Sequence, residues 1–503
     1  MVRIIKAKRI ISMANPEKIG SYMVIDHKKI KYIGEKLPAE FSSLPAEDYG
    51  NATITPAFFD THVHYAGYGY CANSLPLMRA TTTDETIANL KKYVNDNDSR
   101  NYLLFGYSPH RVKEQRLLTR AELDSISGDK PILIALYDGH SALANTAMIK
   151  ACPIKNTKGF YPEKGLYAFE SFYEVYKKVS KMVSVYDFLK GLNIAEKNFI
   201  KNGVTTVTAL QGEGLPLNID LKAVRIFSQW SDLRIVPYFQ TRKISAIRRS
   251  GLKTWGGCFD CAIDGSPAGF DMALIDPYLV DTPFEGNRGM LFYDPRELDP
   301  MIQYAEKKNI QIAIHAIGDR AIDEVVKAFE RNIPKENPQR HRIEHGIFLN
   351  DDLIQRIAQC HLMISTQPAV LSGEIDPLWV YNDILGETRV REQLLPLKKM
   401  LDAGITVSGS SDAPVSIPNP LKAMSAAVHH FNPLQRISAY EALAMYTSNA
   451  ARVMRMDKIL GTLEPGKEAD FVVLDKNPLE ALLHENEQIS VLATCKKGKM
   501  IHF

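Results

Sequence analysis

The strongest constraint on the fold is the alternation of short apolar β runs with helical stretches through the middle of the chain. Helices are expected between the runs, for example at 322–329 and 352–358. The strand candidates are residues 132–136, 204–208, 234–238, 310–314, 342–344, 362–365 and 406–409. Strand and helix that alternate over about 250 residues are typical of a parallel β/α domain. The pattern predicts a closed (β/α)8 barrel of the TIM type.

The two ends of the chain differ from this middle part. Residues 1–54 and 456–503 carry short runs of alternating apolar and polar residues, which are typical of antiparallel strands. Neither end has enough strands for a stable sheet of its own. We therefore expect a small β-sandwich domain built from both termini, with a barrel domain of residues 55–455 between them. The segment at about 66–185 is too long for one loop, and we predict an inserted α/β cover over the barrel mouth.

Composition narrows the class of protein. The chain has 503 residues, of which 45% are hydrophobic and 24% charged, as in an ordinary globular enzyme. A net charge of +3 favours neither nucleic acid nor a membrane surface as partner. We find no signal peptide and no apolar run long enough to span a bilayer. Six scattered cysteines favour a reducing compartment. We expect a cytoplasmic protein that acts on a small molecule, with a homodimer as the default assembly.

Five side chains follow strand candidates in a way that metal binding requires. His62 and His64 end a short apolar run, and residues two apart in a strand point to the same side. His315, His345 and Asp412 each follow a later strand candidate. In a barrel the C-terminal ends of all strands converge on one mouth, so these side chains are expected to meet. Imidazoles with a carboxylate suit zinc or a similar divalent ion.

Two candidates have a catalytic role. Asp412 is expected to act as the general base, because a carboxylate beside an activated water can take its proton. It is also a candidate helix N-cap, since Ala413 and Pro414 follow. His140 follows the strand expected at 132–136. It is suited to stabilise a developing oxyanion, and a hydrogen bond to backbone explains it equally well.

These motifs resemble those of the amidohydrolase superfamily. Residues 56–64 are similar to its first-strand motif, and residues 461–471 are similar to its return into the terminal β domain. The stretches 138–145, 315–321 and 342–345 resemble the amidohydrolase 3 group of YtcJ-like and N-substituted formamide deformylase-like hydrolases. The resemblance implies a barrel with a β-sandwich. It also implies a metal-dependent hydrolase that cleaves an amide-like C–N bond, for example in an N-acyl or N-formyl compound.

One position departs from the family pattern. Relatives often carry a lysine four residues before an Asp-Gly pair, and this lysine, when carboxylated, bridges two metals. Here the pair is expected at Asp264 and Gly265, so the corresponding residue is Asp260. Asp260 can bridge as a carboxylate, Cys258 or Cys261 can bridge as a thiolate, or a single metal needs no bridge. Both cysteines are also explained as small core residues.

The number of ions is therefore open. With two ions, His62, His64 and Asp412 hold one, and His315 and His345 hold the other. With one ion, His345 is left to orient the substrate.

Two other functions are compatible with this fold. A deaminase or cyclic amidohydrolase would use the same barrel. The mononuclear deaminases of the superfamily usually have a Glu shortly after the histidine of the fifth strand, and residues 316–319 contain none. A non-catalytic metal-binding relative would also keep the fold, because fold does not determine function.

Overall fold

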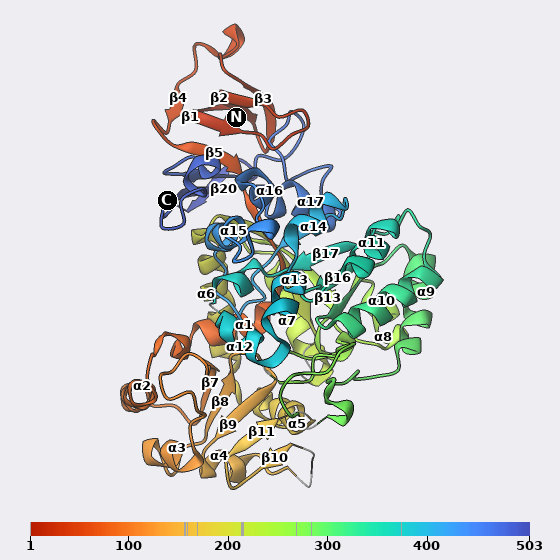
Figure 1. Cartoon of the computed structure of the whole chain (residues 1–503). Helices are drawn as coiled ribbons and strands as arrows, with labels where there is room; N and C mark the ends of the chain where they lie inside the picture. The colour runs from red at the N-terminus through yellow and green to blue at the C-terminus, as the bar shows by residue number, and fades with distance from the viewer. Residues whose placement is uncertain are drawn as a thin grey trace.

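Parallel strands form a barrel in the middle of the molecule (Figure 1). In order around the sheet they are β6 (Phe58–Val63), β12 (Val204–Gln211), β13 (Arg234–Phe239), β14 (Thr254–Gly257), β15 (Gln311–Ala316), β16 (Arg342–His345), β17 (Met363–Thr366) and β18 (Val407–Gly409). The ring nearly closes beyond β18, where Val63 forms a parallel bridge with Ala413. The predicted (β/α)8 barrel is confirmed. The computed structural model describes residues 2–154, 157, 159–168, 170–212, 216–267, 269–282, 284–373 and 375–502.

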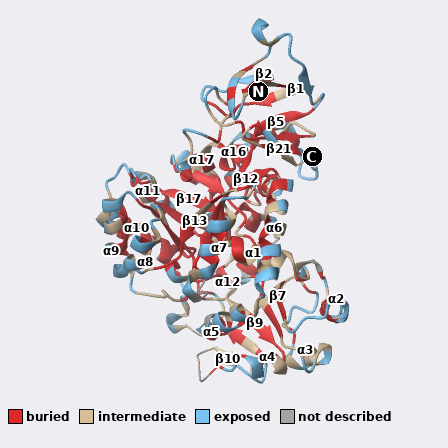
Figure 2. Ribbon diagram, turned by 180° about the vertical axis from the view of Figure 1, so that it is seen from behind, coloured by how far each residue is buried: buried red, intermediate tan, exposed pale blue. Residues whose placement is uncertain are grey.

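Helices surround the barrel and bury one face against its strands (Figure 2). The helices after the cover are α6 (Val185–Lys201), α7 (Ile219–Phe227), α8 (Ile244–Ser250), α9 (Leu298–Lys308), α10 (Asp319–Asn332), α11 (Asp351–Gln359), α12 (Leu378–Leu385), α13 (Glu387–Gln393), α14 (Leu397–Asp402), α15 (Pro420–Val428), α16 (Ala439–Met445), α17 (Ser448–Val453) and α18 (Pro478–Ala481). In α10, Ile322, Val325, Val326 and Phe329 are buried, as the helical spacing of these apolar residues predicts. Along the described part of the chain, no helix combines the length and apolarity needed to cross a membrane.

Both termini build a second sheet at one end of the molecule (Figure 1). Its strands are β1 (Val2–Ile11), β2 (Ile19–Asp26), β3 (Lys29–Gly34), β4 (Ala46–Asp48), β5 (Thr53–Pro56), β19 (Phe471–Leu474), β20 (Val491–Lys496) and β21 (Lys499–His502). β19 pairs antiparallel with β5, so the two ends of the chain are joined by main-chain hydrogen bonds. The expected β domain from both termini is confirmed, while the exact domain boundaries stay a prediction.

The inserted segment has a sheet of its own, ordered β10-β11-β9-β8-β7, at the opposite end of the molecule (Figure 1). We call this segment the cover. Its strands are β7 (Tyr102–Tyr107), β8 (Ile132–Leu136), β9 (Ser141–Ala144), β10 (Phe160–Tyr161) and β11 (Leu166–Ala168). Its helices are α1 (Tyr65–Ala72), α2 (Thr83–Asp96), α3 (Arg120–Ile126), α4 (Thr146–Ala151) and α5 (Glu170–Val179). The strand predicted at 132–136 therefore belongs to the cover.

Helices α1 and α6 connect the cover to the barrel, and they touch at a pair of glycines. A Cβ atom added to Gly191 would lie 2.4 Å from the carbonyl oxygen of Gly69. Only glycine lets the two backbones approach this closely. The entry and the exit of the cover are therefore held side by side.

Strand β14 was missed by the sequence analysis, because its residues Gly256 and Gly257 are poor strand formers. Both have positive φ, +94° and +112°, which favours glycine. A Cβ atom on Gly256 would lie 1.9 Å from the backbone oxygen of Ala313 in β15. The glycines thus permit the close pairing of β14 with β15, and β14 ends immediately before Cys258.

Candidate metal centre

The structure brings the five predicted ligands together at the C-terminal mouth of the barrel. The Asp412 Oδ1 atom lies 3.1 Å from His62 Nε2 and 3.4 Å from His64 Nε2. The His345 ring lies with its centroid 4.6 Å from that of His62 and 4.4 Å from that of His315. All five lie in, or within three residues after, the strands β6, β15, β16 and β18, as the barrel geometry predicts. That they hold a metal stays a prediction.

Cys258 lies in the middle of this group. Its Sγ atom is 3.4 Å from His62 Nε2, His315 Nδ1 and His345 Nε2 alike. Burial would raise the pKa of the Cys258 thiol, but the three imidazoles lower it well below its ordinary value. The backbone N–H of Cys258 donates to Gln240 Oε1 at 2.8 Å, which fixes the position of the residue.

Asp260 and Cys261 lie elsewhere, because the chain turns at Phe259 (φ +49°) into a short 3-10 turn. The Asp260 carboxylate accepts from the Arg242 backbone N–H at 2.9 Å, and 43% of its side chain is exposed. Burial raises the pKa of the Cys261 thiol well above its usual range, so this thiol is held neutral. The structure places Cys258, rather than these two residues, in contact with the histidines, and the bridging roles considered for Asp260 and Cys261 stay predictions.

The donor atoms fit a divalent cation. The ligand atoms of His62, His64 and Asp412 lie within 4.8 Å of one another, and so do those of His62, Cys258 and His345. Burial alone would lower the pKa of His315, but the Cys258 and Asp264 anions raise it to about 10. Anionic donors buried among imidazoles form a site whose charge favours a cation.

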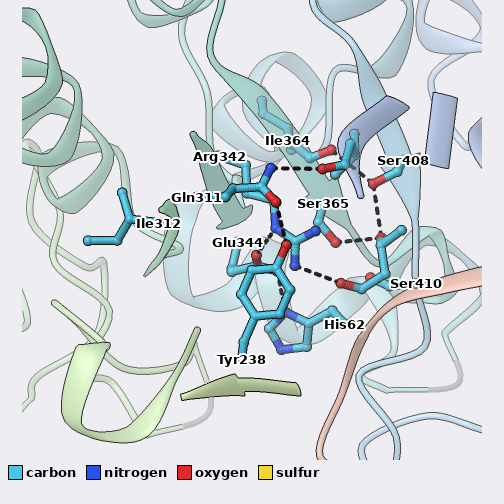
Figure 3. Close-up of polar contacts among 12 residues, drawn as sticks. His62, Tyr238, Gln311, Ile312, Arg342, Glu344, Ile364, Ser365, Ser408 and Ser410 are labelled. Carbon is cyan, nitrogen blue, oxygen red and sulfur yellow. Dashed lines mark hydrogen bonds and ion pairs between the residues drawn. The ribbon is translucent and has the colours of Figure 1, made fainter. Parts of the chain in front are cut away.

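An ion pair below the mouth orients His62 (Figure 3). The Nδ1 atom of His62 lies 2.5 Å from Glu344 Oε2, and Arg342 Nε donates to Glu344 Oε1 at 2.5 Å. The Arg342 guanidinium stacks 4.6 Å above the Tyr238 ring and donates to the Thr61 carbonyl oxygen at 2.9 Å. Burial would raise the pKa of Glu344, whereas Arg342 and His62 lower it. An ionised Glu344 therefore holds His62 with Nε2 facing Cys258 and Asp412.

His345 and His315 have polar partners on the side away from the cluster too. The Nδ1 atom of His345 lies 2.8 Å from Gln367 Oε1, and Gln367 Nε2 donates to Ser410 Oγ at 3.0 Å. The Nε2 atom of His315 lies 3.5 Å from Asp264 Oδ1. Metal-binding imidazoles usually have such partners at the other ring nitrogen. Gln367 was missed from the sequence, and Arg342, Asp264 and Glu344 were noted there only within motifs.

Two of the predicted ligands have a strained backbone. His345 has φ +71° and Asp412 has φ +55°, in the left-handed region that residues other than glycine rarely adopt. In a regular strand, the side chains of Glu344 and His345 would point to opposite faces. The left-handed backbone at His345 turns its ring to the mouth of the barrel instead. Such strain collects at functional sites.

A cavity of about 550 Å³ lies between this cluster and the cover. The cluster forms its floor, since His64, Cys258, His315, His345 and Asp412 line it. Apolar side chains of the cover line it as well: Leu103, Phe105, Leu133, Ala135, Phe172 and Val179. The cavity therefore suits a small molecule with an apolar group.

Polar contacts join the cover to the barrel around this cavity. The Tyr137 hydroxyl donates to the Asp376 carboxylate, and the Ser266 hydroxyl donates to Asp138 Oδ2 at 3.3 Å. His140 lines the cavity, and its backbone N–H donates to Asp138 Oδ1 at 3.2 Å. The structure thus places His140 within the site, and its catalytic role stays a prediction.

Sequence comparison places this barrel and site in a known class. The profile of the amidohydrolase family matches residues 46–502. The chain therefore belongs to the amidohydrolase family, in its amidohydrolase 3 group, whose members are generally hydrolases.

Several individual proteins are similar along nearly the whole chain. Protein LONG AFTER FAR-RED 3 of Arabidopsis thaliana is 29% identical over 89% of this chain and 82% of its own. N-substituted formamide deformylase of Arthrobacter pascens is 23% identical over 95% of this chain and 94% of its own length. The crystal structure of an uncharacterized metal-dependent hydrolase from Pyrococcus horikoshii OT3 superposes with a TM-score of 0.77 at 25% identity, over the full length of both chains.

Proposed function

We propose that this protein is a metal-dependent hydrolase that cleaves an amide-like C–N bond, such as an N-acyl or N-formyl bond, in a small apolar molecule. One observation carries the proposal: imidazole, thiol and carboxylate donors meet on the floor of a cavity with apolar walls. Zinc, or a similar borderline divalent ion, suits this donor set. The similarity to a formamide deformylase supports the choice of bond.

The residues that would bind the metal fall into two groups. His62, His64 and Asp412 form one, and His315 and His345 form the other. A bound divalent cation supplies Lewis-acid activation of water and of the substrate carbonyl.

Two side chains move or hold protons in this scheme. Asp412 accepts the proton of the attacking water at a carboxylate oxygen and delivers it to the leaving nitrogen, a role typically worth about 10²–10⁴-fold in rate. His140 lines the same cavity and donates a hydrogen bond to the developing oxyanion. The apolar cover residues exclude bulk water and bind the apolar part of the substrate.

The experiment is a screen of N-acyl and N-formyl compounds, with metal content measured in parallel by elemental analysis. We expect His62→Ala to lose metal and to lower the rate by at least about 10²-fold, because metal chemistry and proton transfer both depend on the site. His484→Ala serves as the control, since His484 is exposed. A metal-free wild-type protein, or a His62→Ala variant that keeps the wild-type rate, would contradict the proposal.

The same screen, extended to amino-substituted compounds without an acyl group, tests the two alternatives. Deamination would release ammonia from compounds without an acyl group. The turn after His315 offers no Glu, and its Asp319 carboxylate pairs with Arg389 at 2.9 Å, so a proton shuttle of that type has no support here. A non-catalytic relative would bind metal and turn over none of the compounds.

A further inference from the structure

Six side chains at the barrel mouth offer metal-binding atoms. Four are the imidazoles of His62, His64, His315 and His345, and the others belong to Cys258 and Asp412. A tetrahedral zinc ion takes four ligands, so one ion does not use this set. Two-metal sites are common among hydrolases, and their ions share ligands.

The Cys258 sulfur is the donor that lies between the two groups. Its Sγ is 3.4 Å from Nε2 of His62, a residue that also lies with His64 and Asp412 in the first group. The same Sγ is 3.4 Å from His315 Nδ1 and from His345 Nε2, which make up the second. A thiolate has enough lone pairs to bind two cations at once, and thiolates are good ligands for zinc-like ions.

The surrounding structure holds the sulfur in this place. Gly257 has φ +112°, and a Cβ atom there would lie 2.8 Å from the Leu210 side chain, so β14 ends in a conformation suited only to glycine. Gln240 then fixes the Cys258 backbone N–H. Cys258 is a free cysteine, so its sulfur is available as a ligand.

Building on the proposed function, we propose that the thiolate of Cys258 bridges two divalent cations, one held by His62, His64 and Asp412 and the other by His315 and His345. Two metal–sulfur bonds form, and the thiol proton leaves to solvent. This bridge takes the place of the carboxylated lysine that the family resemblance implies, from a position two residues before Asp260.

Cobalt(II) is the probe for the test, because a cobalt–thiolate bond gives a charge-transfer band in the near ultraviolet that nitrogen and oxygen ligands do not give. The full-length metal-free protein is reconstituted with cobalt and dialysed, and bound cobalt per chain is measured together with the spectrum. The variants are Cys258→Ser, Cys258→Ala and the matched control Cys261→Ser, a buried cysteine three residues away. Near-ultraviolet circular dichroism verifies that each variant is folded.

We expect two cobalt ions per chain and a charge-transfer band in the wild type and in Cys261→Ser. Both Cys258 variants should hold one ion or fewer, without the band. The bridge is overturned if a folded Cys258 variant keeps two ions or the band, or if the wild type binds a single ion.

The design separates this inference from the proposed function. If Cys258 variants keep both ions while His62→Ala loses them, the histidine site stands and only the bridge fails. If the wild type binds no cobalt, the metal-dependent function fails with it.

Discussion

The two largest sheets of the molecule differ in the polarity of the side chains that they bury. The terminal sheet encloses a cluster of apolar side chains, among them Ile10, Ile25, Ile54, Phe471 and Val473. The barrel instead buries a hydrogen-bonded polar network within its strands (Figure 3), formed by Thr61, Arg342, Glu344, Ser365 and Ser408. Buried polar groups need satisfied partners, and replacing a buried ion pair by well-packed apolar residues is often neutral or stabilising. The barrel network therefore marks the place where side chains must be oriented, and the terminal sheet marks where close packing is sufficient.

The largest effect is expected from Arg342→Met in the barrel. The change leaves the Glu344 carboxylate buried without its strongest counter-charge, which costs about 3–5 kcal/mol of unfolding free energy. Since Glu344 orients His62, metal affinity should also fall by about 10–100-fold. Urea unfolding and cobalt titration measure the two effects.

Arg116→Met is the control for this change, because Arg116 pairs with Glu122 where 42% of the arginine side chain is exposed. It should cost less than about 1 kcal/mol. If both variants behave alike, the barrel ion pair has no special role.

Phe471→Ala in the terminal sheet should lower the free energy of unfolding as much as Arg342→Met does, but it should leave function unchanged. Phe471 is fully buried, and truncation of such a ring costs about 3–5 kcal/mol. We expect the folded variant to keep the metal content and kcat of the wild type. A drop in kcat of more than a few-fold at a temperature where the variant is folded would show that the terminal sheet acts on the site.

His430 tests whether buried polarity alone marks a functional site. Its Nε2–H donates to the Leu395 carbonyl oxygen at 3.2 Å, and its Nδ1 accepts from the Asn432 N–H at 3.0 Å, so the neutral ring is satisfied by backbone. Burial lowers the pKa of His430 from 6.5 to about 4. The unfolded chain therefore binds this proton more readily, and the stability present above pH 6.5 is lost as the pH falls towards 4.

The upper limit of this loss is about 3 kcal/mol. In His430→Gln the pH dependence of unfolding between pH 6.5 and 4 should be weaker by that amount, with metal binding unchanged. An identical pH dependence in both proteins would refute the assignment.

The smallest effect is expected from Asp260→Asn. Its ion pair with Arg242 lies on the surface, so the change should cost less than about 1 kcal/mol and leave the metal content as it was. Loss of one cation per chain would restore Asp260 as a bridging ligand and remove the contrast with Cys258.

The sequence was informative wherever an apolar run leads directly to a coordinating residue. His62, His64, His315, His345 and Asp412 could be found because parallel strands of a barrel all end at one mouth. The terminal β domain was predictable for a related reason, since neither end of the chain can form a sheet alone.

The features that could not be predicted from the sequence depend on contacts between distant segments of the chain. Gly256 and Gly257 are poor strand formers, and only the close approach of β15 explains their place in a strand, so Cys258 was not recognised as a residue at a strand end. Arg342 and Glu344 carry charges that usually lie on a surface, and their partners Tyr238 and His62 come from other strands.

The crossing of α1 and α6 has a consequence for how proteins of this kind diverge. The cover leaves the barrel after β6 and returns before β12, and these two strands are neighbours in the sheet. Among the predicted site residues only His140 comes from the cover. A cover of another length or sequence can therefore be substituted between the two helices, provided that glycine is kept where Gly69 meets Gly191. Substrate range can then change from one descendant to the next while the reacting centre is inherited intact.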